Sequence, residues 1–277
     1  MKNQVFDWGR FTLTLRREIC ENWRQLSLSL LAIYGALSAT MILGNMMTGG
    51  TSGGMEESLR ASVVVVAFSF LSIFVASLSF HGLSTKTGRI AMFTSPSSMV
   101  EKFAANVLIY IVGFWVAFFV CAHLADLTRI LVLTPFRDID FIVPGPINFI
   151  SEMGSSSNFM SFMGLSEMGM WQAIFWLSLL ANQVIYLLGS VVWPHLSFLK
   201  TFGFIYAVEM VLGVLMLLSV SIFSSMKEFG RWVYELVSNG DFIAFEMPWV
   251  ILQLLVGGVL AWWCFKHKDV ISQGIFK

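Results

Sequence analysis

Charged residues are scarce in this sequence, and the two signs balance. Only 12% of the 277 residues are Asp, Glu, Lys or Arg, about half the share found in a soluble domain. The 17 basic residues match the 17 acidic ones, so no net charge is available to attract nucleic acid or an acidic substrate. With 57% hydrophobic residues and a mean hydropathy of +0.76, the composition is that of a membrane protein.

Cysteines and catalytic motifs are also missing or sparse. The three cysteines, Cys20, Cys121 and Cys264, have the pattern of neither a disulfide framework nor a metal site, and we interpret them as small apolar residues. The chain contains no GxxxxGK[ST] phosphate loop and no HExxH. We therefore expect neither an ATPase site nor another catalytic site in this chain.

Long hydrophobic runs, by contrast, are frequent. A membrane-spanning helix needs about 20 apolar residues, and six runs satisfy this requirement: 26–44, 61–80, 103–125, 171–193, 201–224 and 247–265. The predicted fold is an all-α membrane protein with six transmembrane helices in one domain, residues 1–277. The Gly-, Ser- and Met-rich stretch 126–170 is predicted to be an external loop. Its methionines lack a regular ligand spacing, so no metal site is expected there: Met153, Met160, Met163, Met168 and Met170.

The distribution of Lys and Arg predicts the orientation of the spans. An even number of spans places both termini on one side, and cytoplasmic loops carry the excess of positive charge. Twelve of the 17 basic residues flank the side of the termini, and five flank the other side (Arg60, Arg129, Arg137, Lys227 and Arg231). We therefore expect both termini and the loop 81–102 to lie in the cytoplasm.

The first 25 residues are predicted to form an amphipathic helix in the membrane interface. At 100° per residue, five apolar side chains fall on one face, opposite a polar face with several arginines. These apolar residues are Trp8, Phe11, Leu15, Ile19 and Trp23. Two interpretations are open: a membrane-anchoring ramp into the first span, or an elbow that also contacts a cytoplasmic partner.

The stretch FTSPSSMVEKF, between the second and third runs, carries helix-start signals. Ser95 followed by Pro96 is typical of a helix N-cap and its first residue, and Ser98 with Glu101 forms a capping box. We therefore expect a short, stiff helix within the loop 81–102. Either the caps only begin the third span neatly, or they build a rigid docking element.

A few polar residues interrupt the hydrophobic runs. An ionised carboxylate at the centre of a membrane helix costs about 2.5–3.5 kcal/mol, so it must face protein or water. Such residues either hold helices together or line a substrate path. The candidates for the path are Glu209, Asn182, Gln183 and Gln253.

These features resemble the type 2 permeases of ABC transporters, particularly the small bacterial ones. The stretch FTLTLRREICENWRQL leads directly into the first of six runs, and MFTSPSSMVEKF follows the second. The family pattern is leucine, proline, a small residue and serine, followed by Glu-Lys-Phe. Glu101, Lys102 and Phe103 match it, whereas Ser95 precedes Pro96 where the family more often has leucine. The resemblance covers most of the chain in layout but only these two stretches in motif.

The resemblance implies a permease subunit of an ATP-driven exporter in the bacterial inner membrane. It implies two permease copies working with separate ATP-binding-cassette ATPase subunits, which hold ATP and Mg, and no cofactor or nucleic acid bound to this chain. Residues 81–102 would then contain the coupling helix, and the turn before the fifth run would form a smaller second contact. The expected ATPase-coupling residues are Ser95, Pro96, Ser98, Glu101, Lys102, His195 and Lys200.

Two other classes of protein fit the same pattern. An ion-coupled secondary transporter would use Glu209 as its coupling carboxylate, and would show matched helix breaks in its two halves. A membrane assembly subunit that transports nothing would keep the spans but would need no stiff docking helix.

Overall fold

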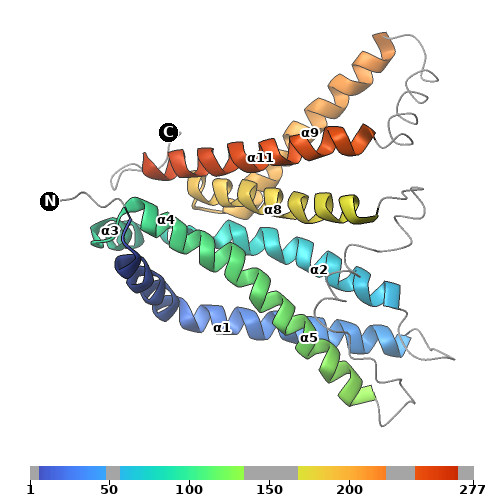
Figure 1. The fold of residues 1–277 in the computed structure, drawn as a ribbon, viewed down its shortest axis with the longest axis horizontal. Coiled ribbons are helices and arrows are strands. Elements are labelled where there is room, and N and C mark those ends of the chain that lie inside the picture. Colours follow the sequence, from blue (N-terminus) through green and yellow to red (C-terminus); the bar gives the residue numbers. More distant parts are fainter. Residues whose placement is uncertain (1–5, 48–56, 134–167, 223–240, 268–277) are drawn as a thin grey trace. The chain divides into compact units, whose positions relative to one another are not determined.

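The computed structural model describes residues 6–47, 57–133, 168–222 and 241–267, and all regular elements in these ranges are helices (Figure 1). In chain order they are α1 (Trp8–Met47), α2 (Glu57–Leu78), the 3-10 helix η1 (His81–Ser84), α3 (Lys86–Thr94), α4 (Met99–Val107), the π-helix η2 (Leu108–Gly113), α5 (Phe114–Leu133), α8 (Met168–Val192), α9 (Ser197–Ile222) and α11 (Asp241–Lys266).

Five helical stretches are long and apolar enough to cross a membrane. They cover Trp8–Met46, Met99–Leu133, Ala173–Val192, Ser197–Leu215 and Met247–Lys266. The predicted span 61–80 falls on α2, whose apolar part, Val63–Leu78, is shorter. An all-helical fold with several potential membrane spans is thus confirmed over the described residues, and the number six stays a prediction.

The first helix is longer than the sequence indicates. The predicted interfacial helix, residues 1–25, and the predicted first span are parts of one 40-residue helix, α1. Residues 1–5 lie outside the described part of the chain. No glycine or proline occurs between Phe11 and Tyr34, so nothing in the local sequence breaks the helix there. Whatever moves the start of α1 therefore also acts on its apolar part.

The third span also extends beyond its predicted limits. Helices α4, η2 and α5 follow one another without a gap from Met99 to Leu133. The π-helical turn η2 is a local widening of the kind often found near functional sites. The predicted external loop 126–170 therefore begins too early, because Asp126 and Arg129 belong to α5 and form a buried ion pair, with 2.8 Å between Nε and Oδ1. Residues 134–167 lie outside the described ranges.

The helices form two compact units within the predicted membrane domain. Unit 1 contains residues up to Val75 and residues from Pro96 to 162, and unit 2 contains Ala76–Ser95 and residues from 163 onward. In unit 1, α1 packs against α4 and α5. The buried ring of Phe68 on α2 contacts four rings of α5 at centroid distances of 5.0–5.9 Å: Phe114, Trp115, Phe118 and Phe119. Aromatic pairs of this kind contribute about 0.5–1.5 kcal/mol each beyond the area they bury.

Unit 2 is built on α8, which packs against α11 and α9. The hydroxyl groups of Ser79 and Ser190 are 2.8 Å apart and buried, which joins the residues after α2 to α8. Gly189 on α8 lies directly against Thr201 on α9, so the two helices approach each other closely. Beyond this crossing α9 leans away from α8, and nearly all its side chains from Phe202 to Leu215 are exposed (Figure 1).

Candidate functional site

The loop between α2 and α4 contains a separate short helix, α3. The Thr85 side chain caps it by accepting a hydrogen bond from the Gly88 backbone N–H at 3.1 Å. The helix ends at Thr94, and Ser95 is extended, with φ −66° and ψ 142°. A helix that begins with Pro96 was therefore the wrong prediction. The residue before a proline avoids the helical region, so Ser95 ends α3 instead of capping the next helix.

The capping box predicted for this loop is confirmed. The Ser98 hydroxyl accepts a hydrogen bond from the Glu101 backbone N–H at 3.2 Å, and the Glu101 carboxylate accepts one from the Ser98 backbone N–H at 2.8 Å. Helix α4 accordingly begins at Met99. Two donors that the helix start leaves without backbone partners are thereby satisfied.

Most of the residues first selected in this loop are not exposed, and α3 carries an exposed face of its own. Glu101 and Lys102 are buried, at 0% and 5% exposure, whereas Pro96 is exposed and Ser95 and Ser98 are half-buried. One face of α3 points outward and combines a positive charge with apolar and hydroxyl groups. It consists of Lys86, Thr87, Ile90, Ala91 and Thr94, and we call it the α3 face. Ile90 is half exposed, which makes it the main apolar group of this face.

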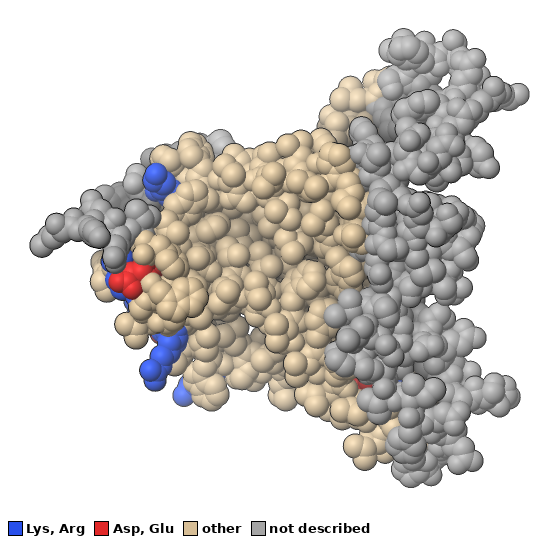
Figure 2. Space-filling view, viewed as in Figure 1, with Lys and Arg blue, Asp and Glu red and all other residues tan. Residues whose placement is uncertain are grey.

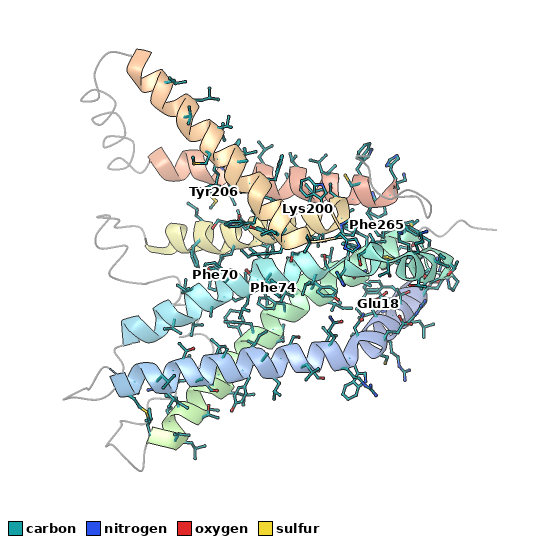
Figure 3. All side chains as sticks on the ribbon, turned by 180° about the vertical axis from the view of Figure 1, so that it is seen from behind. Glu18, Phe70, Phe74, Lys200, Tyr206 and Phe265 are labelled. Atoms are coloured by element: carbon teal, nitrogen blue, oxygen red, sulfur yellow. The ribbon has the colours of Figure 1, made fainter. Side chains whose placement is uncertain are left out.

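Contacts within unit 2 hold α3 in place. Gly88 lies so close to the Gly82 carbonyl that a Cβ at this position would overlap the carbonyl oxygen. Phe93 stacks on Phe265 of α11 at a centroid distance of 6.5 Å, and Phe80 contacts the same ring at 5.0 Å. Figure 3 labels Phe265 on α11. The α3 face therefore stands on a supported helix and not on a loose connector.

Sequence reasoning missed α3, although a local signal for it exists. Thr85 is one of the residue types preferred at a helix N-cap, although no Glu or Gln three residues later strengthens the signal. The nearby Ser-Pro-Ser-Ser stretch contains stronger helix-start signals. The start of the short helix was therefore predicted at Pro96, about ten residues after the start of α3.

Glu101 makes contacts that local sequence could not indicate. Its Oε1 accepts a hydrogen bond from the backbone N–H of Asp7 at 2.9 Å and lies 3.3 Å from Nη2 of Arg10. The partners are 94 and 91 positions away, on the first turn of α1. Glu101 is therefore a junction between two helices.

The proposed second contact, the turn between α8 and α9, is exposed. His195 and Lys200 both lie on the surface. Leu196 between them is also exposed and has φ 55°, the only positive φ of a non-glycine residue in the described part of the chain. The left-handed conformation is unfavourable for a leucine, by about 1–2 kcal/mol. The structure contains nothing that tests a partner at this turn.

The amphipathic face predicted for the N-terminal helix is divided between two environments. Phe11 is buried and Leu15 half-buried within unit 1, whereas Trp8, Ile19 and Trp23 are exposed. Glu18 and Asn22 are also half-buried; Figure 3 labels Glu18. Three of the five side chains of the predicted apolar face are thus exposed and two pack within unit 1, and the interfacial position of this helix stays a prediction.

The four polar residues predicted for a substrate path do not share one environment. Gln183 on α8 is fully buried, and its neighbour Asn182 is exposed. Gln253 on α11 is half-buried, and Glu209 on α9 is exposed, although it interacts electrostatically with the buried Tyr186. Burial thus favours helix packing for Gln183 and leaves Glu209 accessible.

On the face seen in Figure 2, charged side chains lie over the first part of α1 and near the end of α11, and the helix surfaces beyond them carry almost none. Comparison of the chain with models of protein families, with characterised proteins and with solved structures finds no match.

Proposed function

We propose that this chain is the membrane-spanning permease subunit of an ATP-driven ABC exporter, and that α3 is the helix through which a separate ATPase acts on it. The chain supplies the apolar helices, and the partner ATPase supplies ATP binding and hydrolysis. Two copies of the chain, or this chain with a related permease, enclose the substrate path in the bacterial inner membrane, with six spans and both termini in the cytoplasm.

The observation that carries the proposal is the short capped helix between two apolar helices. Helix α3 presents an exposed face and is held from behind by Phe93 on Phe265 and by the Gly88–Gly82 approach. A supported helix can transmit displacement, because its backbone hydrogen bonds are internal and its side chains are packed. A chain that only spans the membrane needs no such element between two helices.

The docking residues in this proposal differ from those first selected. Because Glu101 and Lys102 are buried, we assign the contact with the ATPase to the α3 face, with Ile90 at its centre. A few residues that become desolvated near the centre of an interface carry most of its binding energy, and an exposed apolar side chain is suited to this.

The test is to purify the tagged chain from its own membranes in mild detergent and to measure vanadate-sensitive ATP hydrolysis in the eluate. The wild-type chain is expected to bring ATPase activity with it. Ile90→Asp places a charge in the α3 face and is expected to weaken association by about 2 kcal/mol or more, roughly thirtyfold. His267→Asp is the matched control, because it adds the same charge at an exposed position outside this face.

Equal ATPase activity from both variants would contradict the role of α3. No ATPase activity with the wild-type chain would contradict the proposed function as a whole.

One observation favours a second candidate, an ion-coupled secondary transporter. Glu209 is an exposed carboxylate on α9, a helix whose one other charged residue is Lys200 near its start. A carboxylate there has to meet protein or water, as a coupling residue does. This candidate predicts transport that survives ATP depletion and stops when the proton gradient is collapsed.

A further inference from the structure

One buried carboxylate joins the first turn of α1 to the first turn of α4. Glu101 Oε2 accepts the Ser98 backbone N–H, and Oε1 accepts the Asp7 backbone N–H and faces the Arg10 guanidinium. The Glu101 side chain is fully buried, whereas that of Arg10 is 42% exposed. Three donors from two distant segments therefore converge on one anion. Such charge-assisted hydrogen bonds are about twice as strong as neutral ones.

The part of α1 that meets Glu101 is itself a well-formed helix start. The Asp7 carboxylate accepts a hydrogen bond from the Gly9 backbone N–H at 2.8 Å, which is the geometry of an N-cap. Phe6, before the cap, packs on Phe11 in the next turn at a centroid distance of 5.4 Å, as in a hydrophobic staple. Glu101 thus binds a rigid turn and not a fraying end.

The negative charge of Glu101 is not needed for capping α4. A capping box accepts glutamine as well as glutamate at this position, because one oxygen is enough to accept the Ser98 N–H. The second oxygen binds the start of α1. A buried charge without partners is strongly unfavourable, and the α1 contacts supply partners for this one, besides its electrostatic interaction with Lys102.

We propose that Glu101 is a positioning residue that makes the starts of α1 and α4 one rigid body. This inference rests on the proposed function for its consequence. The boundary between the two units falls between Ser95 and Pro96, so α3 belongs to unit 2 and α4 to unit 1. A push on α3 passes through Ser95–Ser98 to α4, and Glu101 transfers it to α1. Since α1 is continuous, the displacement reaches its apolar part, residues 26–47.

The junction itself is tested by amide hydrogen exchange, with mass spectrometry of peptides covering residues 6–20 in the full-length detergent-solubilised protein. Glu101→Gln keeps the cap of α4 but removes the charge that faces Arg10. We expect exchange in the first turns of α1 to become roughly tenfold faster, because a charged hydrogen bond is lost there. Arg10→Gln breaks the same ion pair from the exposed side and is expected to give the same increase.

Glu21→Gln is the matched control. It removes the exposed ion pair between Arg17 and Glu21 on the same helix, where both side chains are about half exposed. Exposed pairs of this type contribute little, so exchange near residue 10 should stay at the wild-type rate. Unchanged exchange in Glu101→Gln, or an equal increase in Glu21→Gln, would overturn the junction.

A second measurement tests whether Glu101 transfers displacement to α1 or only stabilises the start of that helix. In the purified complex with its ATPase, vanadate-trapped nucleotide is expected to change exchange in the peptides of α1 in the wild-type chain and in Glu21→Gln, but not in Glu101→Gln. A persistent nucleotide-dependent change in Glu101→Gln would contradict transfer through this residue. If the first measurement succeeds and no ATPase accompanies the chain, the junction stands and the proposed function fails.

Discussion

Gly189→Ala is expected to weaken the packing of α8 on α9, whereas Gly203→Ala is not. A Cβ at position 189 would overlap the Thr201 hydroxyl oxygen and lie 2.8 Å from the Thr201 Cβ and Cγ2, and Thr201 is buried. A Cβ at position 203, on the neighbouring helix, would meet no atom within 4 Å. The two substitutions are chemically identical, so their difference isolates the close helix approach.

The expected difference in stability between Gly189→Ala and Gly203→Ala comes from the steric cost that only one of them carries. Replacing glycine by alanine in a helix gains up to about 1 kcal/mol from helix propensity, and this gain applies to both positions. Forcing a methyl group into a packed contact costs about 1–3 kcal/mol, and this cost applies only to position 189. Gly189→Ala should therefore be about 1–3 kcal/mol less stable than Gly203→Ala.

Stability can be measured by titrating the protein in mild detergent with SDS and following tryptophan fluorescence. Thr201→Ala removes two of the three close atoms, so it should restore part of the stability lost in Gly189→Ala. Equal stability of Gly189→Ala and Gly203→Ala would refute the close approach of α8 and α9.

Two further predictions concern the loop and the polar residue of α9. Gly88→Ala should loosen α3 and lower ATPase association, because the added Cβ would overlap the Gly82 carbonyl. Gly82→Ala is the control: its Cβ meets open space, so this variant should behave as wild type. The ATPase activity that co-purifies with each variant compares them, and equal activity would contradict the supported position of α3. Glu209→Gln should leave this ATPase activity unchanged, because the proposed contact lies on the α3 face. Transport that is abolished by Glu209→Gln and independent of ATP would favour the ion-coupled alternative.

In the loop, the contacts between residues close in sequence were predictable, and those between distant residues were not. The capping box of Ser98 and Glu101 needs only four consecutive residues, and it was predicted correctly. Sequence cannot show that Glu101 also binds Asp7 and Arg10, because these partners lie more than 90 positions away and are brought together only by the packing of α1 on α4. Sequence for this reason gave no sign that Glu101, which was selected as a coupling residue, is buried.

Sequence does not show which members of a helical face pack against protein. Trp8, Trp23 and Phe11 share the predicted apolar face, but only Phe11 is buried, because tertiary packing selects which of these side chains is covered. The predicted span 103–125 ends before Asp126, because charged residues usually lie at a membrane boundary. Here Arg129 lies one turn away and pairs with it, so α5 continues to Leu133.

The most direct test of the proposed α3 contact is to identify what lies next to position 90 in native membranes. A photoreactive side chain replaces Ile90 in one variant and His267 in another, and cross-linked products are probed with a photoreactive ATP analogue. The account predicts that position 90 captures an ATP-binding protein and that position 267 does not. Capture of lipid alone at position 90, or of the same ATP-binding protein equally at both positions, would contradict the central role given to α3.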